Sequence, residues 1–341
     1  MKNKLHAKIP TRIDLAGGTL DISPLYHILE KKMTINLAVG VYARVELDVG
    51  TKDFQLCSED QKITVEGSFE EICSSPKLPL LSLYAKQLWN SKLPCFHLRT
   101  SAESPAGAGL GGSSALSVAV CGIIAKAREK IDGFKFESDD HFIRYVQDTE
   151  TKLIRVPTGC QDYWGAFKGG YNIIKFPPGK TLVENHPYSI CNLSDFLTLC
   201  FSGKSRASGI NNWEVFKKAF DGDENIISSL NEIGSITEQL ATSLLKGDLD
   251  GALSLSKKEW QARTHLWPKI ETPETQKLDW AAKEAGALFS RVCGAGGGGV
   301  MAIFSPPEKK DRVKKALNQA GGSILSGNST DIGLSIQDSE V

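Results

Sequence analysis

The sequence lacks any excess of one charge, since 40 lysines and arginines are balanced by 40 aspartates and glutamates. A neutral chain has no broad electrostatic surface for nucleic acid or anionic lipid, so a phosphate group would have to be bound by a local structure. Long apolar runs are missing too. No window approaches the roughly 18 apolar residues of a membrane span, and residues 1–10 have no apolar core of the signal-peptide type. We therefore expect a cytoplasmic protein with neither nucleic-acid nor membrane partners.

Cysteine pairs of the CxxC type are absent as well. The eight cysteines are scattered, mostly within apolar runs such as LTLCF and VAVCGII, which favours a reduced compartment over a disulfide framework or a zinc site. Repeats and low-complexity tracts are also lacking. What remains is a chain of 341 residues with 41% hydrophobic and 23% charged residues, long enough for two domains with sizeable cores.

The pattern along the chain favours an α+β fold with two domains. Helices are segregated from short strands, which argues against a doubly wound sheet. A polar segment at 180–195 separates an N-terminal domain, expected at 1–188, from a C-terminal domain at 189–341. The expected strands lie at 34–49, 54–58, 62–67, 94–101, 169–179, 196–203, 299–305 and near 331–336, and the expected helices at about 78–90, 114–130, 138–152, 222–262, 274–286 and 308–321.

A glycine-rich stretch, SPAGAGLGGSSALSVAV at 104–120, is the most informative local pattern. Its glycines precede two serines and an alanine-rich run, which is typical of a loop that approaches an anion and opens a helix. A dinucleotide-binding turn and a Walker loop both fit poorly, because a polar segment separates the loop from the preceding strand and no lysine precedes the serines. The pattern favours a helix N-terminus that holds a phosphate chain while Ser113 or Ser114 reaches a metal. The alternative is a tight turn with no ligand.

Two further stretches combine charges and glycines. TRIDLAGGTLDISPLY near the N-terminus places Arg12, Asp14 and Asp21 around a two-glycine turn, where they either face one cleft or are solvated loop charges. CGAGGGGVMAIF at 293–304 brings another glycine run directly before a strand. Such a run lets backbone pass close to backbone or to a ligand.

Candidates for a cation site and an acceptor site follow in QDTETKLIRVPTGCQDYWGAF. Glu150 lies on an expected helix, and Asp162 follows a Pro-Thr-Gly turn. A carboxylate and a hydroxyl from the glycine loop are hard oxygen ligands of the kind that Mg²⁺ prefers, and a second carboxylate can orient or deprotonate an acceptor hydroxyl. The alternative for Glu150 is an exposed helix charge.

Taken together, these residues resemble the GHMP kinase superfamily, which is named for galacto-, homoserine, mevalonate and phosphomevalonate kinases. Its three motifs stand here in order as PTRIDLAGGTLD, PAGAGLGGSSA and CGAGGGG. The resemblance implies a two-domain α+β fold in which ATP binds between a ribosomal-protein-like N-terminal domain and a ferredoxin-like C-terminal domain. It implies that ATP contacts the second motif, namely Pro105, Gly107, Ala108, Gly109, Leu110, Gly111, Gly112, Ser113 and Ser114.

The resemblance also implies individual roles. The magnesium-binding serine corresponds to Ser113 when the match is anchored on Gly109-Leu110-Gly111, and to Ser114 when it is anchored on Ala115. The other implied roles fall on Glu150 for the metal, Asp162 for catalysis, Arg12 for the charge of the transferred phosphoryl group, and Gly18, Asp21, Gly296 and Gly297 for the substrate.

One branch of the superfamily is especially similar. The extra glycine of the loop, Gly112, and the segment GCQDYWGAFKGGYNIIKF resemble sugar 1-kinases such as D-glycero-D-manno-heptose 7-phosphate kinases and bacterial fucokinase domains, whose pattern there is G-K-Q-D-Q-Y. The chain departs from that branch in AGGTLD, where A-G-G-G-T-D is usual, and in Thr158-Gly159-Cys160, which replaces Gly-Gly-Lys. After the strand at 196–203, Lys204 and Arg206 suit a monoester phosphate on the acceptor. The alternative is ordinary turn composition.

We therefore expect an ATP- and Mg²⁺-dependent kinase that phosphorylates the anomeric hydroxyl of a sugar or sugar phosphate, with D-glycero-D-manno-heptose 7-phosphate as the first candidate. A mevalonate-type isoprenoid kinase, a fucose- or galactose-type free-sugar kinase and a non-catalytic nucleotide-binding regulator are the alternatives. Besides the small-molecule substrate, the sequence leaves room for a second copy of the chain in a homodimer.

Overall fold

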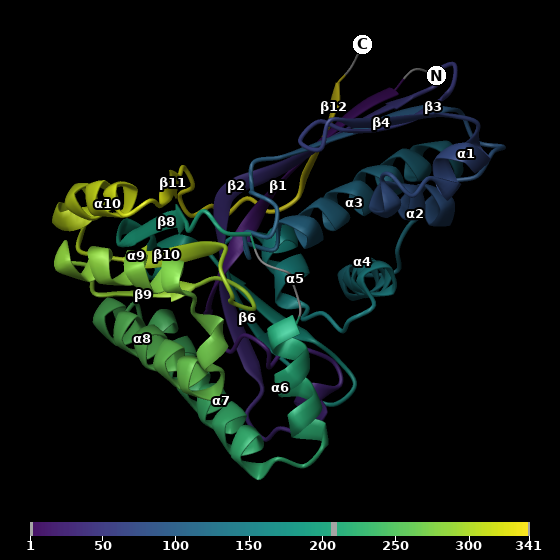
Figure 1. Ribbon diagram of the computed structural model, residues 1–341. Helices are drawn as coiled ribbons and strands as arrows, with labels where there is room; N and C mark the ends of the chain where they lie inside the picture. Colours follow the sequence, from purple (N-terminus) through teal and green to yellow (C-terminus); the bar gives the residue numbers. More distant parts are fainter. Residues whose placement is uncertain (1–2, 206–209, 340–341) are drawn as a thin grey trace.

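The computed structural model describes residues 3–205 and 210–339, and within them the strands form two sheets (Figure 1). In the eight-stranded sheet the order is β12-β1-β2-β5-β3-β4, with β6 paired to β2 and β7 to β6. In the four-stranded sheet it is β11-β8-β10-β9. The first sheet contains β1 (Asn3–Ala16), β2 (Met33–Val49), β3 (Phe54–Ser58), β4 (Ile63–Gly67), β5 (Phe96–Ala102), β6 (Tyr171–Lys175), β7 (Leu182–His186) and β12 (Ser335–Ser339). The second contains β8 (Leu197–Phe201), β9 (Phe289–Val292), β10 (Val300–Phe304) and β11 (Ser323–Leu325).

Helices cover these sheets in two groups (Figure 1). The first group packs with the large sheet and consists of α1 (Phe69–Ser74), α2 (Pro79–Leu88), α3 (Gly112–Asp132), α4 (Asp139–Ile154) and α5 (Gln161–Lys168). The second group belongs to the other half and consists of α6 (Ile210–Phe220), α7 (Glu224–Leu245), α8 (Leu249–Leu266), α9 (Pro273–Glu284) and α10 (Lys310–Gln319). None of the helices in the described part of the chain combines the length and the apolar character that a membrane span requires.

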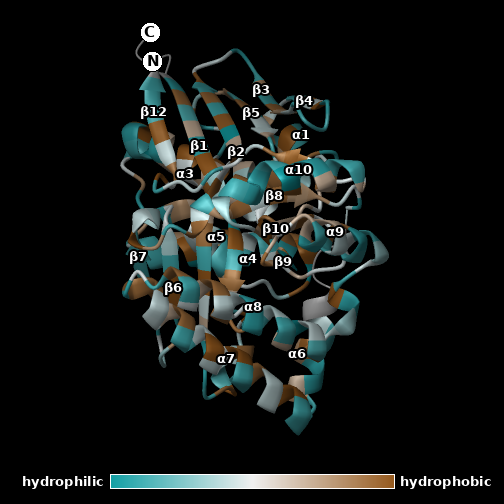
Figure 2. Ribbon diagram, turned by 90° about the vertical axis from the view of Figure 1, so that its left-hand side faces the viewer, coloured by the Kyte–Doolittle hydropathy of each residue, from teal (hydrophilic) through white to brown (hydrophobic). Residues whose placement is uncertain are grey.

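The long hairpin of β1 and β2 lies between the two halves of the molecule. The first seven residues of β2 are all buried, whereas burial alternates along the rest of the strand. The alternating part has one face on the core and one in water, and brown and teal segments alternate there in Figure 2. The buried part has protein on both faces, because Ile35 and Leu37 share an apolar cluster with α7, whereas Asn36, on the opposite face, donates to the carbonyl of Gln161 in α5. Side chains on β1 beside this region therefore lie between the two halves.

The expected α+β class is confirmed, and most of the expected elements are present. The expected helix at 222–262 is two helices, α7 and α8, because the chain turns at Gly247 with φ +67° and Asp248 caps the second helix. Four strands, β1, β7, β9 and β11, were not predicted from the sequence. The boundary at 188/189 stays a prediction, and β12, from the second segment, pairs with β1 of the first sheet.

Candidate active site

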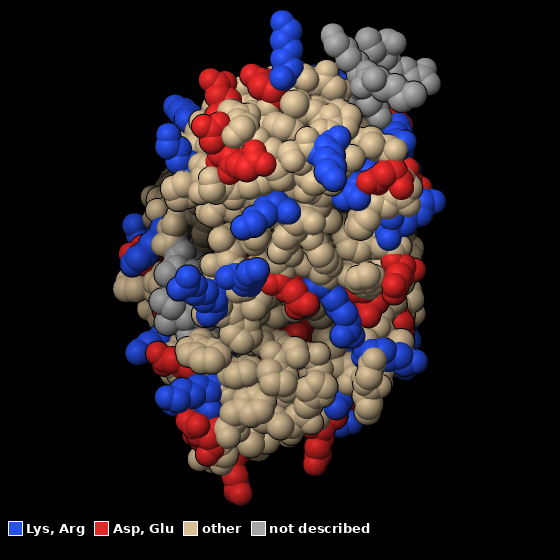
Figure 3. Space-filling view, turned by 90° about the vertical axis from the view of Figure 1, so that its right-hand side faces the viewer, with Lys and Arg blue, Asp and Glu red and all other residues tan. Residues whose placement is uncertain are grey.

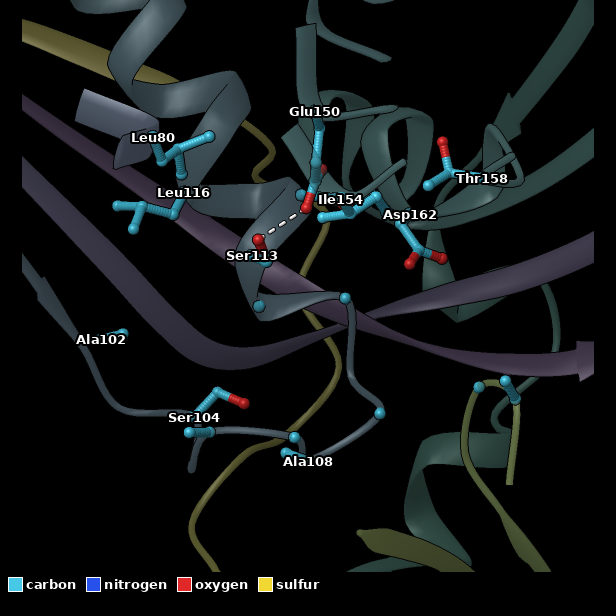
Figure 4. A pocket seen from close by; sticks show the side chains of 18 of the residues that line it. Leu80, Ala102, Ser104, Ala108, Ser113, Leu116, Glu150, Ile154, Thr158 and Asp162 are labelled. Atoms are coloured by element: carbon cyan, nitrogen blue, oxygen red, sulfur yellow. Dashed lines mark hydrogen bonds between the residues drawn. The ribbon is translucent and has the colours of Figure 1, made fainter. Parts of the chain in front are cut away.

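One cavity of about 530 Å³ brings together most of the residues expected at the site (Figure 4). The glycine loop, the turn after β1, the end of α4 and the start of α5 all line it. The expected residues in its lining are Arg12, Gly18, Asp21, Pro105, Gly107, Ala108, Gly109, Gly111, Gly112, Ser113, Ser114, Glu150 and Asp162. Leu110 lies beneath the loop, fully buried in an apolar cluster. Charges of both signs are interspersed on the face shown in Figure 3.

The carbonyl groups of the glycine loop are held by the surrounding protein. The carbonyl of Ala108 accepts from the Val300 N–H (2.7 Å), that of Gly109 from Arg12 Nη1 (2.8 Å), and that of Leu110 from the Arg12 N–H (3.1 Å). In a trans peptide the following N–H points away from the carbonyl. The N–H groups after these three carbonyls are therefore directed away from the groups that hold the carbonyls.

Helix α3 begins at the end of this loop. Gly107, Gly109 and Gly111 all have positive φ, near +70 to +80°, which a residue with a side chain rarely adopts. Gly111 is the N-cap residue and supplies no side-chain cap, so the first-turn N–H groups and the positive end of the helix dipole remain available to an anion. A side chain at Gly111 would also approach Asp162, whose Cβ lies 3.1 Å from the added Cβ position. The loop and Asp162 are therefore in direct contact.

Ser113 and Glu150 point toward each other in the cavity wall (Figure 4). Ser113 Oγ donates a hydrogen bond of 2.6 Å to Glu150 Oε1. Glu150 is 4% exposed, so the interpretation as an exposed helix charge is wrong. Burial raises the pKa of Glu150, and the Ser113 hydrogen bond opposes that shift.

These two side chains fit a divalent cation. Glu150 Oε2 is buried and has no hydrogen-bond partner, although a buried carboxylate oxygen normally has one. No group of three His, Cys, Asp or Glu side chains that could hold a metal is present among the described residues. A carboxylate, a hydroxyl and phosphate oxygens together form the kind of ligand set that Mg²⁺ uses in sites shared with a nucleotide. Ser114 lines the same cavity but is buried.

Asp162 and Arg12 form an ion pair on the other side of the loop. Arg12 Nε donates to Asp162 Oδ1 at 2.8 Å, and Arg12 Nη2 contacts the same oxygen. Arg12 is buried, with a side chain only 3% exposed, whereas that of Asp162 is 26% exposed. The second residue of α5 therefore presents a carboxylate to the cavity, oriented by a guanidinium that also holds the glycine loop.

Asp21 lies beneath the start of α5. Its Oδ2 accepts a 2.9 Å hydrogen bond from the Gln161 N–H, at the N-terminus of the helix that carries Asp162. The Asp21 carboxylate packs so closely on Gly159 that a side chain there would collide with it. Burial, followed by the charge of Asp162, raises the pKa of Asp21 to about 6.

A buried ion cluster that the sequence analysis missed lies directly behind this site. Asp14 contacts Arg263 at 2.7 Å and Arg291 at 2.9 Å, and Arg291 contacts Glu259 at 3.0 Å. Asp14 is fully buried, so the interpretation as a solvated loop charge is wrong. The Arg263 guanidinium reaches the cavity wall beside Gly18. No local pattern announces this cluster, because its members come from β1, α8 and β9.

The third glycine segment, at 293–299, lines the cavity with different residues from those expected. Gly294 and Ala295 line the cavity. Gly296 and Gly297 instead pack on Ile270: a side chain at Gly296 would collide with it, and the Gly297 N–H donates to its carbonyl at 2.8 Å. A substrate-binding role for Gly296 and Gly297 remains a prediction.

The loop after β8 adjoins the glycine loop. Lys204 Nζ lies 3.3 Å from a carboxylate oxygen of Glu274, and Ser205 Oγ donates to the carbonyl of Ala106 at 2.7 Å. Lys204 is not among the described residues that line the cavity. Arg206 lies outside the described residues. Acceptor binding by Lys204 and Arg206 therefore remains a prediction.

The far end of the cavity is largely apolar and was not anticipated. Leu80 and Leu116 lie on the side of Ser113 away from Asp162 (Figure 4). The turn between β3 and β4 adds Asp60 and Gln61 to the same lining. No charge, glycine or spacing pattern marks these residues in the sequence.

Comparisons with known proteins identify the family. The family described as GHMP kinases N terminal domain matches residues 80–170, and that described as GHMP kinases C terminal matches residues 241–323. The chain is 27% identical over 331 residues to D-glycero-alpha-D-manno-heptose 7-phosphate kinase of Campylobacter jejuni, covering 94% of this chain and 95% of the relative. It is 25% identical over 248 residues to mevalonate kinase of Pyrococcus furiosus, covering 70% and 68%.

A solved structure has the same fold. A D-glycero-D-manno-heptose 1-phosphate kinase from Bacteroides thetaiotaomicron matches with a TM-score of 0.77 and 20% identity, covering 99% of this chain and all of the other. The two family matches lie in order along the chain, one containing the glycine loop, Glu150 and Asp162, the other containing the third glycine segment. The chain therefore belongs to the GHMP kinases, a family of ATP-dependent phosphotransferases.

Proposed function

We propose that the chain is a sugar kinase that transfers the γ-phosphoryl group of ATP to the anomeric hydroxyl of a sugar phosphate, with D-glycero-D-manno-heptose 7-phosphate as the first candidate. One observation carries this proposal. A helix N-terminus with a glycine loop, the Ser113–Glu150 pair and the Asp162–Arg12 pair all line a single cavity. These groups suit a phosphate chain, a divalent cation and an acceptor hydroxyl, respectively.

Asp162 is the residue that meets the acceptor. Its Oδ1 is occupied by Arg12, so Oδ2 remains to accept the hydrogen bond of a sugar hydroxyl and to orient it for attack. Arg12 balances negative charge during transfer, because its guanidinium lies between Asp162 and the carbonyl of Gly109 in the glycine loop. Catalysis then comes mainly from positioning and electrostatic stabilisation, as is usual for phosphoryl transfer.

Ser113 and Glu150 would hold Mg²⁺, with Ser113 rather than Ser114 as the hydroxyl ligand. Ser113 Oγ donates a 2.6 Å hydrogen bond to Glu150 Oε1, and Ser113 is exposed whereas Ser114 is buried. When bound, the cation neutralises charge on the β- and γ-phosphates of ATP. The apolar end of the cavity at Leu80 and Leu116 has the character needed to cover the base of the nucleotide.

The choice of acceptor rests on similarity. The Campylobacter jejuni relative is matched over nearly its whole length, whereas the Pyrococcus furiosus relative is matched over about two thirds. This difference favours a heptose phosphate over mevalonate. Asp21, buried at the acceptor side of the cavity next to Asp162, is proposed to bind a sugar hydroxyl through its second oxygen.

A substrate panel tests the function directly. ADP release is measured with ATP and Mg²⁺ in the presence of heptose 7-phosphate, fucose, galactose or mevalonate, with Asp162→Asn as the matched inactive control. We expect the highest kcat/KM with heptose 7-phosphate and an anomeric phosphate in the ³¹P spectrum of the product. Turnover of mevalonate alone would reassign the acceptor, and ATP binding without any turnover would identify a regulator.

A further inference from the structure

Gln161, the residue directly before Asp162, is held in place through its backbone. Its N–H donates to Asp21 Oδ2 and its carbonyl accepts from Asn36 Nδ2, both at 2.9 Å. Both partners are buried, with Asp21 2% exposed and Asn36 fully buried. The first residue of α5 is therefore fixed between the turn after β1 and the strand β2.

Two buried asparagines support this arrangement from the sheet. Asn36 on β2 lies opposite Asn172 on β6, and Asn172 is also fully buried. Asn172 Nδ2 donates to Asn36 Oδ1 at 3.0 Å and to the carbonyl of Gly169, the C-cap residue of α5, at 3.1 Å. The asparagine pair therefore contacts α5 at both ends, so the backbone of Gln161 is part of a connected network.

The side chain of Gln161, by contrast, has an oxygen without a partner. Gln161 is 6% exposed and lines the cavity together with Asp21 and Asp162. Its Oε1 is buried and has no hydrogen-bond partner in the described part of the chain, although a buried amide oxygen normally has one. An unpaired buried polar atom destabilises a protein. Its position on a fixed segment of the cavity wall therefore indicates a partner that arrives with the ligand.

The groups around this side chain suit hydroxyl groups. Ionised Asp21 and Asp162 only accept hydrogen bonds, whereas an amide has a donor end and an acceptor end. A half-turn of the amide about its last bond exchanges the two ends with little change in shape, so Gln161 can bind a hydroxyl in either direction. A carboxylate could use only the donor end, and the two aspartates would repel its charge.

We propose that Gln161 binds the acceptor, and that its side-chain amide takes the sugar hydroxyl next to the one that is phosphorylated. Gln161 and Asp162 are consecutive residues in the wall of one cavity, so they suit two neighbouring hydroxyls of one sugar. This inference rests on the proposed function, because it assumes that Asp162 meets a sugar hydroxyl. It makes Gln161 a specificity residue that favours a polyhydroxylated acceptor over one with a carboxylate at this position.

Gln161→Met tests the inference, and Gln147→Met is the matched control. Methionine keeps the length of glutamine and removes the amide. Gln147 lies on α4, and its Nε2 donates to the carbonyl of Thr158 at 2.7 Å. Within the described residues, Gln147 does not line the cavity. The two variants make the same chemical change close to the turn before α5, but only Gln161→Met changes the cavity wall.

The readouts are the KM for heptose 7-phosphate at saturating ATP and Mg²⁺, and the Tm. We expect Gln161→Met to raise this KM about tenfold, as the loss of one hydrogen bond would. Its Tm should be unchanged or higher, because an apolar group replaces an unpaired amide. Gln147→Met should lower the Tm, because it loses a paired hydrogen bond, and should change KM less than about threefold.

The 2-deoxy form of the same acceptor provides a second measurement that does not depend on a folded variant. Wild type should use the 2-deoxy acceptor with a kcat/KM about tenfold lower, because the hydroxyl that Gln161 binds is missing. Gln161→Met should use both acceptors about equally well, whereas Gln147→Met should discriminate between them as wild type does. A purely structural role of Gln161 would not change this discrimination.

Two kinds of result overturn the inference and can be told apart. If wild type phosphorylates heptose 7-phosphate but uses the 2-deoxy acceptor equally well, or if Gln161→Met keeps the KM of Gln147→Met, the role of Gln161 fails and the proposed function stands. If wild type phosphorylates neither a sugar nor a sugar phosphate, the proposed function and the role of Gln161 fail together.

Discussion

Replacing Asp21 by asparagine should stabilise the protein at alkaline pH. Asp21 is 2% exposed, and burial is the largest cause that raises its pKa from an ordinary value of 3.8 to about 6. A raised pKa means that the folded state prefers the protonated form, so the contribution to stability is full below pH 3.8 and is lost as the pH rises through 6. At pH 8 the ionised Asp21 carboxylate therefore lowers the free energy of unfolding by about 3 kcal/mol.

Asparagine has a similar shape, keeps an oxygen for the Gln161 N–H and carries no charge. For a chain of 341 residues, about 3 kcal/mol corresponds to an increase in Tm of about 4 °C at pH 8. At pH 5 the native carboxyl is mostly protonated, so the difference between variant and wild type should fall to about half. Thermal unfolding followed at pH 5 and pH 8 measures both values.

Asp14→Asn is the control, because it should destabilise the protein whereas Asp21→Asn should stabilise it at alkaline pH. Burial alone would raise the pKa of Asp14, but the charges of Arg291 and Arg263 outweigh it and hold the pKa well below its usual range. The Asp14 carboxylate therefore contributes to stability above the pKa that it has in the unfolded chain. The free energy of unfolding of Asp14→Asn should be lower than that of wild type by about 3–5 kcal/mol at both pH 5 and pH 8. A Tm of Asp21→Asn that equals or falls below wild type at pH 8 would refute the assignment of a strained, ionised Asp21.

The remaining predictions concern the cavity. Asp162→Asn should lower kcat by about 10²–10⁴ with little change in ATP affinity, and a loss below about tenfold in steady-state assays would remove Asp162 from the catalytic role. Ser113→Ala and Glu150→Gln should raise the Mg²⁺ concentration for half-maximal rate, whereas Ser114→Ala should not; equal effects of both serine variants would contradict the choice of Ser113. Gly111→Ala should weaken ATP binding in calorimetry, because its φ of +71° costs a side chain about 1–2 kcal/mol and its Cβ would crowd Asp162; unchanged affinity would show that the loop adjusts.

The glycine loop and Asp162 could be identified from the sequence because both stand in a local pattern. The glycine loop precedes a helix, and Asp162 follows a turn that opens another helix. Patterns of this kind depend on neighbours in the chain, so they can be recognised without knowledge of the tertiary structure. The choice between Ser113 and Ser114 could not be made from local sequence. It depends on the contact with Glu150, which is 37 residues away along the chain from Ser113.

Two of the missed strands, β1 and β9, have a common physical cause. β1 carries Thr11, Arg12 and Asp14, and β9 carries Ser290 and Arg291, all of them buried. Strand prediction relies on apolar residues at alternate positions, and buried polar residues break that alternation. The charged residues among them are tolerated in the interior because partners far away along the chain neutralise them, and such partners cannot be read from local sequence.

The buried charged residues of β1 also explain how the two halves are aligned at the site. Arg12 and Asp14 are two residues apart on β1, so their side chains emerge on the same face of the strand. Arg12 holds Asp162 and the glycine loop, while Asp14 holds Arg263, Arg291 and the N–H of Gly294 in the third glycine segment. One strand therefore sets the distance between the Asp162 carboxylate and the backbone contributed by the other half. Because a shift of β1 by one residue would move both side chains to the opposite face, the buried charges make that register costly to change.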